Sequence, residues 1–133
     1  MDCVPVDRDH PDLIVSIPLG PYAPRDARHR VAVLDSPSPD LRDALVLLTS
    51  ELVTKAVART ESAPGESAAE LRAWMPTDVV RVELTGPPGF DITPRPDGTS
   101  DYELMLLEQV ADRWSGGQAP PCDSVWFEID RRR

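Results

Sequence analysis

The feature that most constrains the fold is a long apolar stripe in the middle of the chain. Apolar side chains recur there at helical spacing, at Leu41, Leu45, Leu48, Leu52 and Ala56. Ser38 can cap this segment and Pro39 suits a first helical position, so the pattern predicts a helix from about residue 39 to residue 60. It is the longest element expected in the chain, and such a stripe faces a core.

The remaining elements alternate between strand and helix patterns. β-Branched or alternating runs predict strands over 13–18, 70–75, 79–84 and 124–129, and helical spacing predicts helices over 23–34 and 100–114. The order is β-α-α-β-β-α-β, in which strands outnumber crossover helices. We therefore predict an α/β (α+β) two-layer sandwich, with a mixed, mostly antiparallel sheet and the helices on one face. Residues 13–130 form its single domain, preceded by a poorly ordered segment, 1–12, and followed by a short tail, 131–133.

Composition excludes several classes of protein. The chain has 133 residues and a net charge of −9, which argues against a nucleic-acid or anionic-membrane partner held by general electrostatics. The chain contains no run of about 18 apolar residues, so no transmembrane helix is predicted. Residues 1–12 lack the features of a secretory signal. We therefore expect a cytoplasmic protein. Asparagine is absent and Lys55 is the sole lysine, which excludes any mechanism that needs an asparagine ligand.

The cysteines and histidines do not suggest a metal centre. Cys3 and Cys122 lie far apart, and neither His10 nor His29 stands at ligand spacing from a cysteine or from the other histidine. Two free thiols are expected rather than a disulfide. We predict no bound metal.

Four stretches resemble one protein family. Residues 48–57, LTSELVTKAV, resemble the "LLxSELVTNAV" helix of the anti-sigma-factor serine kinases, which belong to the histidine-kinase-like (GHKL) ATPases. Residues 25–28 resemble the family's "xxAR" motif, residues 80–90 its "lrVeVxDxGpGF" motif, and residues 110–128 its closing "LADRWG…VWFEL" motif. These stretches follow the family's order across roughly residues 13–130. The resemblance implies a GHKL-like fold and a degenerate member of the family.

The family's chemistry is a magnesium–ATP site, and the resemblance places its parts on this chain. Glu51 matches the general base. Lys55 stands where the family has the magnesium-binding asparagine, and an ammonium has no lone pair to offer a metal. Gly86 and Gly89 fall at nucleotide-site positions, but the adenine-binding carboxylate is missing beside them, and residues 101–104 lack the glycines that wrap the phosphates. We therefore predict a decayed site with no ATP or magnesium. One alternative is that the Lys55 ammonium replaces magnesium and holds phosphate directly.

The resemblance leads to three readings of function. The first is a regulatory, protein-binding pseudokinase resembling anti-sigma factors, which binds a sigma factor or an anti-anti-sigma-type regulator and is not an enzyme. The second is an active ATP-dependent protein serine kinase built around Glu51. The third is an accessory or structural subunit unrelated to sigma regulation. The resemblance also allows a homodimer.

Overall fold

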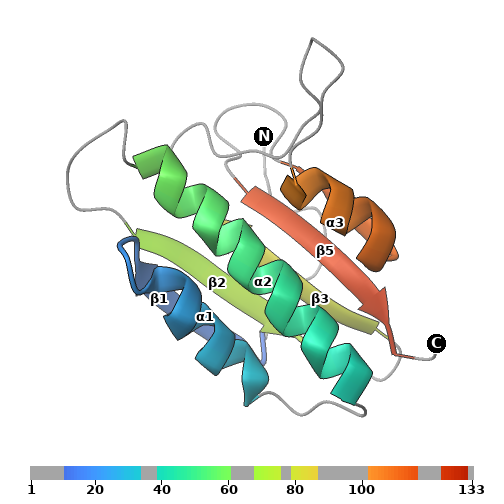
Figure 1. Cartoon of the computed structure of the whole chain (residues 1–133). Coiled ribbons are helices and arrows are strands. Elements are labelled where there is room, and N and C mark those ends of the chain that lie inside the picture. The colour runs from blue at the N-terminus through green and yellow to red at the C-terminus, as the bar shows by residue number, and fades with distance from the viewer. Residues whose placement is uncertain are drawn as a thin grey trace, which may run out of the picture.

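The computed structural model describes residues 11–33, 39–60, 68–75, 79–86, 102–116 and 124–131. In chain order, the elements in these residues are β1 (Leu13–Pro18), α1 (Ala23–Ala32), α2 (Pro39–Thr60), β2 (Ala68–Trp74), β3 (Val79–Thr85), α3 (Tyr102–Val110), β4 (Arg113–Ser115) and β5 (Ser124–Asp130). Figure 1 shows the three helices over one face of the sheet, with α2 in the middle and packed against both α1 and α3. The predicted two-layer α+β sandwich is confirmed.

The five strands form one sheet in the order β1-β2-β3-β5-β4. Every pairing between them is antiparallel, so the sheet is antiparallel throughout its described part. The hairpin of β2 and β3 lies at its centre, and the last long strand, β5, pairs with β3 from the other side. This arrangement places β3 and β5, which are far apart in the sequence, in direct register.

Strand β4 corrects one sequence-based prediction. The spacing predicted a single helix over residues 100–114, but α3 ends at Val110. The Ala111 N–H still donates to the Leu107 carbonyl at 3.1 Å, whereas the next amide, on Asp112, donates to the Glu128 carbonyl of β5 at 2.9 Å. From Asp112 onward the backbone therefore pairs with the sheet. Hydrogen bonds to β5 satisfy the same backbone amide groups that a longer helix would otherwise satisfy.

The core lies between the helices and one face of the sheet. The apolar stripe of α2 faces it, and Leu45, Leu48 and Leu52 are fully buried there. The sheet contributes alternate residues of each strand, which are apolar and buried: Ile17, Leu71, Ala73, Val80, Val82, Leu84, Val125, Phe127 and Ile129. This alternation follows from the two-residue period of a strand, and it directs the intervening side chains to the opposite face.

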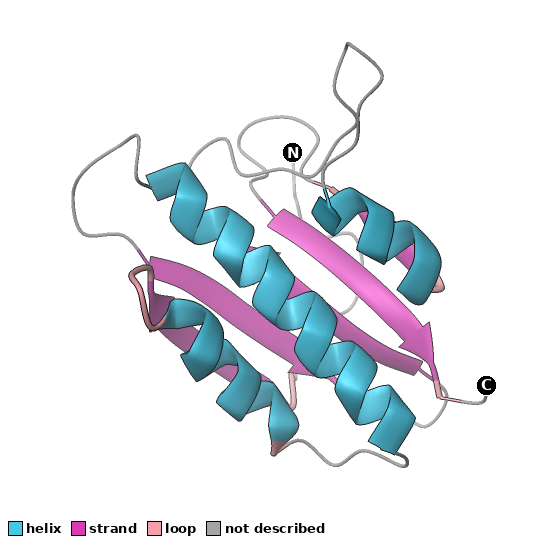
Figure 2. Ribbon diagram, in the orientation of Figure 1, coloured by secondary structure: helices cyan, strands magenta, loops and turns pink. Residues whose placement is uncertain are grey.

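That opposite face is polar, and all described helices lie on the other side of the sheet (Figure 2). It carries Arg72 and Trp74 from β2, Arg81 and Glu83 from β3, and Trp126, Glu128 and Asp130 from β5. Arginine and glutamate in the central strands of a sheet are unusual, because charged side chains are seldom buried unless they are paired. This face therefore holds the chain's most informative polar groups.

The predicted limits of the domain fall partly outside the described residues. At the N-terminal side, Asp12 is tied to β2: its N–H donates to the Ala73 carbonyl at 2.8 Å, and its carboxylate accepts from the Met75 N–H at 2.6 Å. At the C-terminal side, Arg131 donates to the Met75 carbonyl at 3.2 Å. In the described part of the chain, none of the helices combines the length and apolarity needed to span a membrane.

Candidate functional site

The residues predicted from the family resemblance lie on two elements. Glu51 and Lys55 are one turn apart on α2, both are partly buried, and both engage neighbouring groups. Gly86 directly follows β3, and Gly89 lies outside the described residues. These positions do not test the nucleotide site, so the role of each residue stays a prediction. Within the described ranges, no three metal-ligating side chains gather at one point.

The strongest concentration of charge lies on the polar face of the sheet. We call it the sheet-face cluster, and it consists of Arg81, Glu83, Arg113, Trp126, Glu128 and Asp130. Strand register assembles it, because Arg81 pairs with Glu128 across β3 and β5, Glu83 pairs with Trp126, and Arg113 pairs with Glu128 across β4 and β5. Side chains in such cross-strand pairs have their Cβ atoms about 4.5–5.5 Å apart.

Arg81 is the centre of the cluster. Its side chain donates from Nη1 to Glu128 Oε2 at 3.0 Å, and its Nη2 lies 3.9 Å from Glu83 Oε2. Its guanidinium also stacks on the Trp126 ring, 4.0 Å from the ring centroid. Arg81 is only 5% exposed, so these contacts form in a partly desolvated setting where cation–π and ionic attraction are stronger than in water.

Arg113 closes the cluster at the open edge of the sheet. Its Nε donates to Glu128 Oε1 at 2.7 Å, and its Nη2 bonds to Asp130. Burial raises the pKa of Glu128, but the hydrogen bonds from Arg113 and Arg81 outweigh burial and hold that pKa below its ordinary value. The bonds to Asp130 and Glu128 raise the pKa of Arg113. Glu128 is therefore an ionised acceptor held between two cations.

Glu83 is the least compensated member. It is 7% exposed, and in the described part of the chain its nearest charge is Arg81 at 3.9 Å, which is beyond hydrogen-bonding distance. Its cross-strand neighbour Arg72 turns instead to Glu70, at 2.9 Å. The Arg72 Nε is buried and has no hydrogen-bond partner among the described residues. The Arg72 Nε is thus a buried donor without a direct partner beside Glu83, which is costly unless a ligand or water serves it.

The cluster has the chemistry of a polyol site. An indole ring offers a flat apolar face, carboxylates accept hydrogen bonds from hydroxyl groups, and guanidinium groups donate to hydroxyl oxygens in a fixed fork. Each Glu128 oxygen has a second lone pair beyond the one used by arginine. Arg113, whose side chain is 49% exposed, still has N–H groups that face solvent. Arg81 is nearly buried and supports this edge, whereas Arg113 is exposed and Trp126 and Glu128 are partly exposed, so these three can meet a ligand, with Glu83 beside them.

Sequence reasoning missed this cluster. The alternation in residues 79–84 did place Arg81 and Glu83 on one face of a strand, and the final strand placed Trp126 and Glu128 together. The pairing of these two strands was not in the pattern. Arg113 was assigned to a helix, so its approach to Glu128 could not be foreseen.

Comparison with known proteins gives a different indication from the motif resemblance. No family model matches the chain. The chain is 32% identical over 83 residues to D-ribose pyranase 1 of Streptomyces griseus, a match that covers 62% of this chain and 54% of that protein. The matched region is thus about half the length of the curated relative.

This match contradicts the function predicted from the family resemblance. It relates the chain to a protein named for an activity on a sugar, and not to a sigma-factor regulator or a protein kinase. The prediction of a regulatory pseudokinase resembling anti-sigma factors is therefore wrong, and so is the expected role in sigma-factor regulation. The motifs that suggested it are short, and the structure places several of their residues in the core or in the sheet-face cluster.

Proposed function

We propose that this protein binds a small neutral sugar, a pentose such as D-ribose, at the sheet-face cluster and interconverts its ring forms. The proposal rests on the grouping of Trp126, Glu128 and Arg113 near one edge of the sheet. Two nearly buried charged side chains, Arg81 and Glu83, lie beside them. The partial match to a D-ribose pyranase supports the choice of a sugar.

Trp126, Glu128 and Arg113 each have a defined role in binding. One face of the Trp126 ring is covered by Arg81, and in this proposal the opposite face stacks against the C–H groups of a sugar ring. Glu128 accepts from two neighbouring sugar hydroxyls, one at each oxygen. Arg113 donates to a third oxygen while it stays bonded to Glu128 and Asp130. Ionised groups make hydrogen bonds about twice as strong as neutral groups do, and these bonds offset the cost of removing a sugar from water.

Ring-form interconversion requires the movement of one proton away from the sugar and one toward it. The anomeric hydroxyl loses its proton, the bond between the anomeric carbon and the ring oxygen breaks, and the ring oxygen gains a proton. The open-chain aldehyde then closes through a different hydroxyl. We assign the proton transfer to Glu83, because Glu128 is held ionised by two arginines and is a poor base. Glu83 pairs across the strands with Trp126, which places it beside the stacked ring.

Two measurements on the purified full chain test the proposal. Saturation-transfer NMR with D-ribose measures binding, and exchange between the pyranose and furanose signals of 13C-labelled ribose measures interconversion. Glu128→Gln should weaken binding about tenfold or more, because a hydrogen bond to a charged group contributes about 1.5–3 kcal/mol. Glu83→Gln should slow exchange and leave binding largely intact.

Glu108→Gln is the matched control, because Glu108 is an exposed glutamate on α3, on the helical side of the molecule. It should change neither quantity. Absence of any ribose signal in the wild-type protein, or equal loss in Glu128→Gln and Glu108→Gln, would rule out the sheet-face cluster as a sugar site.

The finer description of the fold is also a proposal. We infer a GHKL-like sandwich, and its support is the long central α2, the three helices on one face and the closing β5 beside the central hairpin. An experimental structure superposed on a histidine-kinase-like domain tests this inference. A different connection of the helices over the sheet would overturn it.

A further inference from the structure

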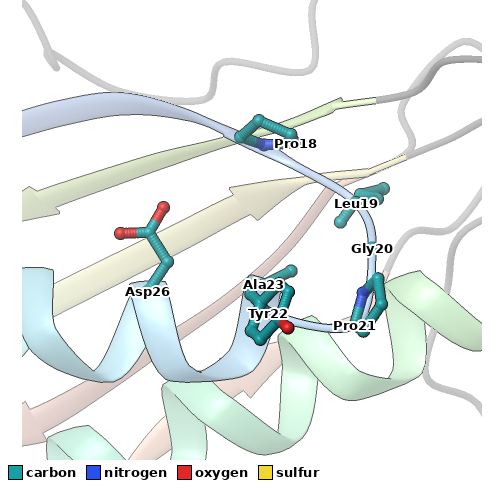
Figure 3. A pocket seen from close by; sticks show the side chains of 7 residues that line it. All are labelled: Pro18, Leu19, Gly20, Pro21, Tyr22, Ala23 and Asp26. Carbon is teal, nitrogen blue, oxygen red and sulfur yellow. The ribbon is translucent and has the colours of Figure 1, made fainter.

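A hollow lies away from the sheet-face cluster, at the turn that joins β1 to α1. Its volume is about 360 Å³ (Figure 3). Its lining residues form one continuous stretch of chain and the first turn of a helix: Pro18, Leu19, Gly20, Pro21, Tyr22, Ala23 and Asp26. Hollows of this size fall within the range that small molecules occupy in proteins.

The local sequence makes the hollow apolar and keeps it open. Pro18 ends β1 and Pro21 begins the turn into α1, and the Gly20 carbonyl accepts a hydrogen bond from the Ala23 N–H at 3.1 Å. An added side-chain carbon at Gly20 would meet no atom within 4 Å, so the space in front of the turn is empty of protein. Leu19 and the prolines supply apolar walls.

Asp26 supplies the formal charge in this lining. Figure 3 shows its carboxylate rising from α1 toward the end of β1, on the opposite side of the hollow from Pro21. Its Oδ1 lies 3.4 Å from Arg30 Nε, with both side chains well exposed, so this ion pair is weak. The other oxygen, Oδ2, makes no contact with a donor in the ranges that the structure describes. One carboxylate oxygen is therefore available to a ligand.

The hollow is unsuited to an anion, although it lies at a helix N-terminus. In the first turn of α1, the Ala23 N–H is already bonded to Gly20, Pro24 has no N–H, and the Asp26 N–H is bonded to the Tyr22 carbonyl at 2.9 Å. The amides that usually hold phosphate at a helix start are thus largely used or missing. The Asp26 carboxylate and the net charge of −9 both repel a second negative charge.

We propose that this hollow binds an organic cation, specifically a primary alkylammonium group with a short apolar chain. The ammonium pairs with Asp26 Oδ2, and the chain lies against Leu19 and Pro21. The Tyr22 ring, at the start of α1 and 74% exposed, adds a cation–π contact. A free amine and a lysine side chain of another protein present the same chemistry, and the test separates them.

The test uses 15N-labelled full-length protein titrated with n-butylammonium and, in parallel, with n-butanol, which has the same chain without the charge. We expect n-butylammonium to shift the amide signals of residues 19–26 and to bind at least tenfold more tightly than n-butanol. Asp26→Asn should abolish that difference, and Tyr22→Ala should weaken binding several-fold. Added salt should weaken the wild-type affinity.

Asp43→Asn provides the matched control, because Asp43 is an exposed aspartate near the start of α2 and does not line the hollow. It should bind n-butylammonium as the wild type does. Equal binding of n-butanol and n-butylammonium, or unchanged binding in Asp26→Asn, would refute the proposal, and so would shifts confined to other residues. Spermidine and a capped Gly-Lys-Gly peptide then identify the source, according to which of the two binds more tightly.

Discussion

Replacing Arg81 with methionine should destabilise the fold more than any other single change in the sheet-face cluster. Arg81 is nearly buried and holds Glu128 at 3.0 Å and Glu83 at 3.9 Å. The methionine keeps the length and apolar character of the side chain, so the change mainly removes charge. Glu128 retains Arg113, whereas Glu83 loses its ion pair with Arg81.

The expected cost follows from the state of Glu83. At 3.9 Å and an effective dielectric constant of about 20, the attraction between two unit charges is about 4 kcal/mol. Removing one partner of a buried pair typically costs about 3–5 kcal/mol, because the other charge is left uncompensated. The stacking of Arg81 on Trp126 adds about 0.5–2 kcal/mol. We therefore expect the free energy of unfolding to fall by about 3.5–7 kcal/mol, out of a total of about 5–15 kcal/mol for a protein of ordinary stability.

Urea denaturation followed by circular dichroism measures this change. The double variant Arg81→Met/Glu83→Met provides the decisive comparison, because it removes both charges and leaves apolar side chains in their place. It should be more stable than Arg81→Met alone. Arg113→Met, which affects the half-exposed end of the same network, should cost only about 1 kcal/mol. A loss below about 1 kcal/mol in Arg81→Met, or a double variant no more stable than the single one, would refute this reasoning.

Three further predictions concern pH, the core and nucleotide. The pKa of Glu128 is lowered from 4.5, so the stability that this carboxylate contributes should be complete above about that pH and be lost as pH falls. In urea titrations between about pH 3 and 7, the free energy of unfolding should therefore fall less steeply toward acid pH in Glu128→Gln than in the wild type. An equal pH dependence in the two proteins would contradict the lowered pKa of Glu128. Leu48→Ala should cost about 2–5 kcal/mol in urea unfolding, whereas Leu47→Ala, at a 37% exposed position on the same helix, should cost less than about 1 kcal/mol. Mg-ATP should leave the melting temperature unchanged in the wild type and in Lys55→Ala, since a ligand at 100 times its Kd would add about 2.7 kcal/mol.

The long helix and the strands could be predicted because their patterns are local. The leucine spacing of α2 repeats over several turns, and the runs of β1, β3 and β5 that predict strands are short. Local patterns of this kind determine which face of each element is apolar. Strand β4 could not be predicted in this way. Its three residues, Arg113–Ser115, have no strand pattern of their own and become a strand only because β5 offers backbone partners.

The candidate sites could likewise be predicted only where their residues are close in the sequence. Alternation within β3 was enough to place Arg81 and Glu83 on one face, but the charge balance of that face depends on Glu128 and Arg113, which arrive from later in the chain. The hollow beside α1 was also missed, since an apolar turn between a strand and a helix looks like ordinary loop sequence. Its character depends on the direction of the Asp26 side chain, which a linear pattern does not give.

By itself, the sequence determined the two-layer α+β architecture, the long central helix and the apolar side of each strand. These depend on residues a few positions apart, and the periods of helix and strand make them readable. Only the tertiary structure decided which charges meet. Antiparallel pairing of β3, β5 and β4 brings Arg81, Glu128 and Arg113 within hydrogen-bonding distance, and ionic attraction, burial and pKa all depend on such distances.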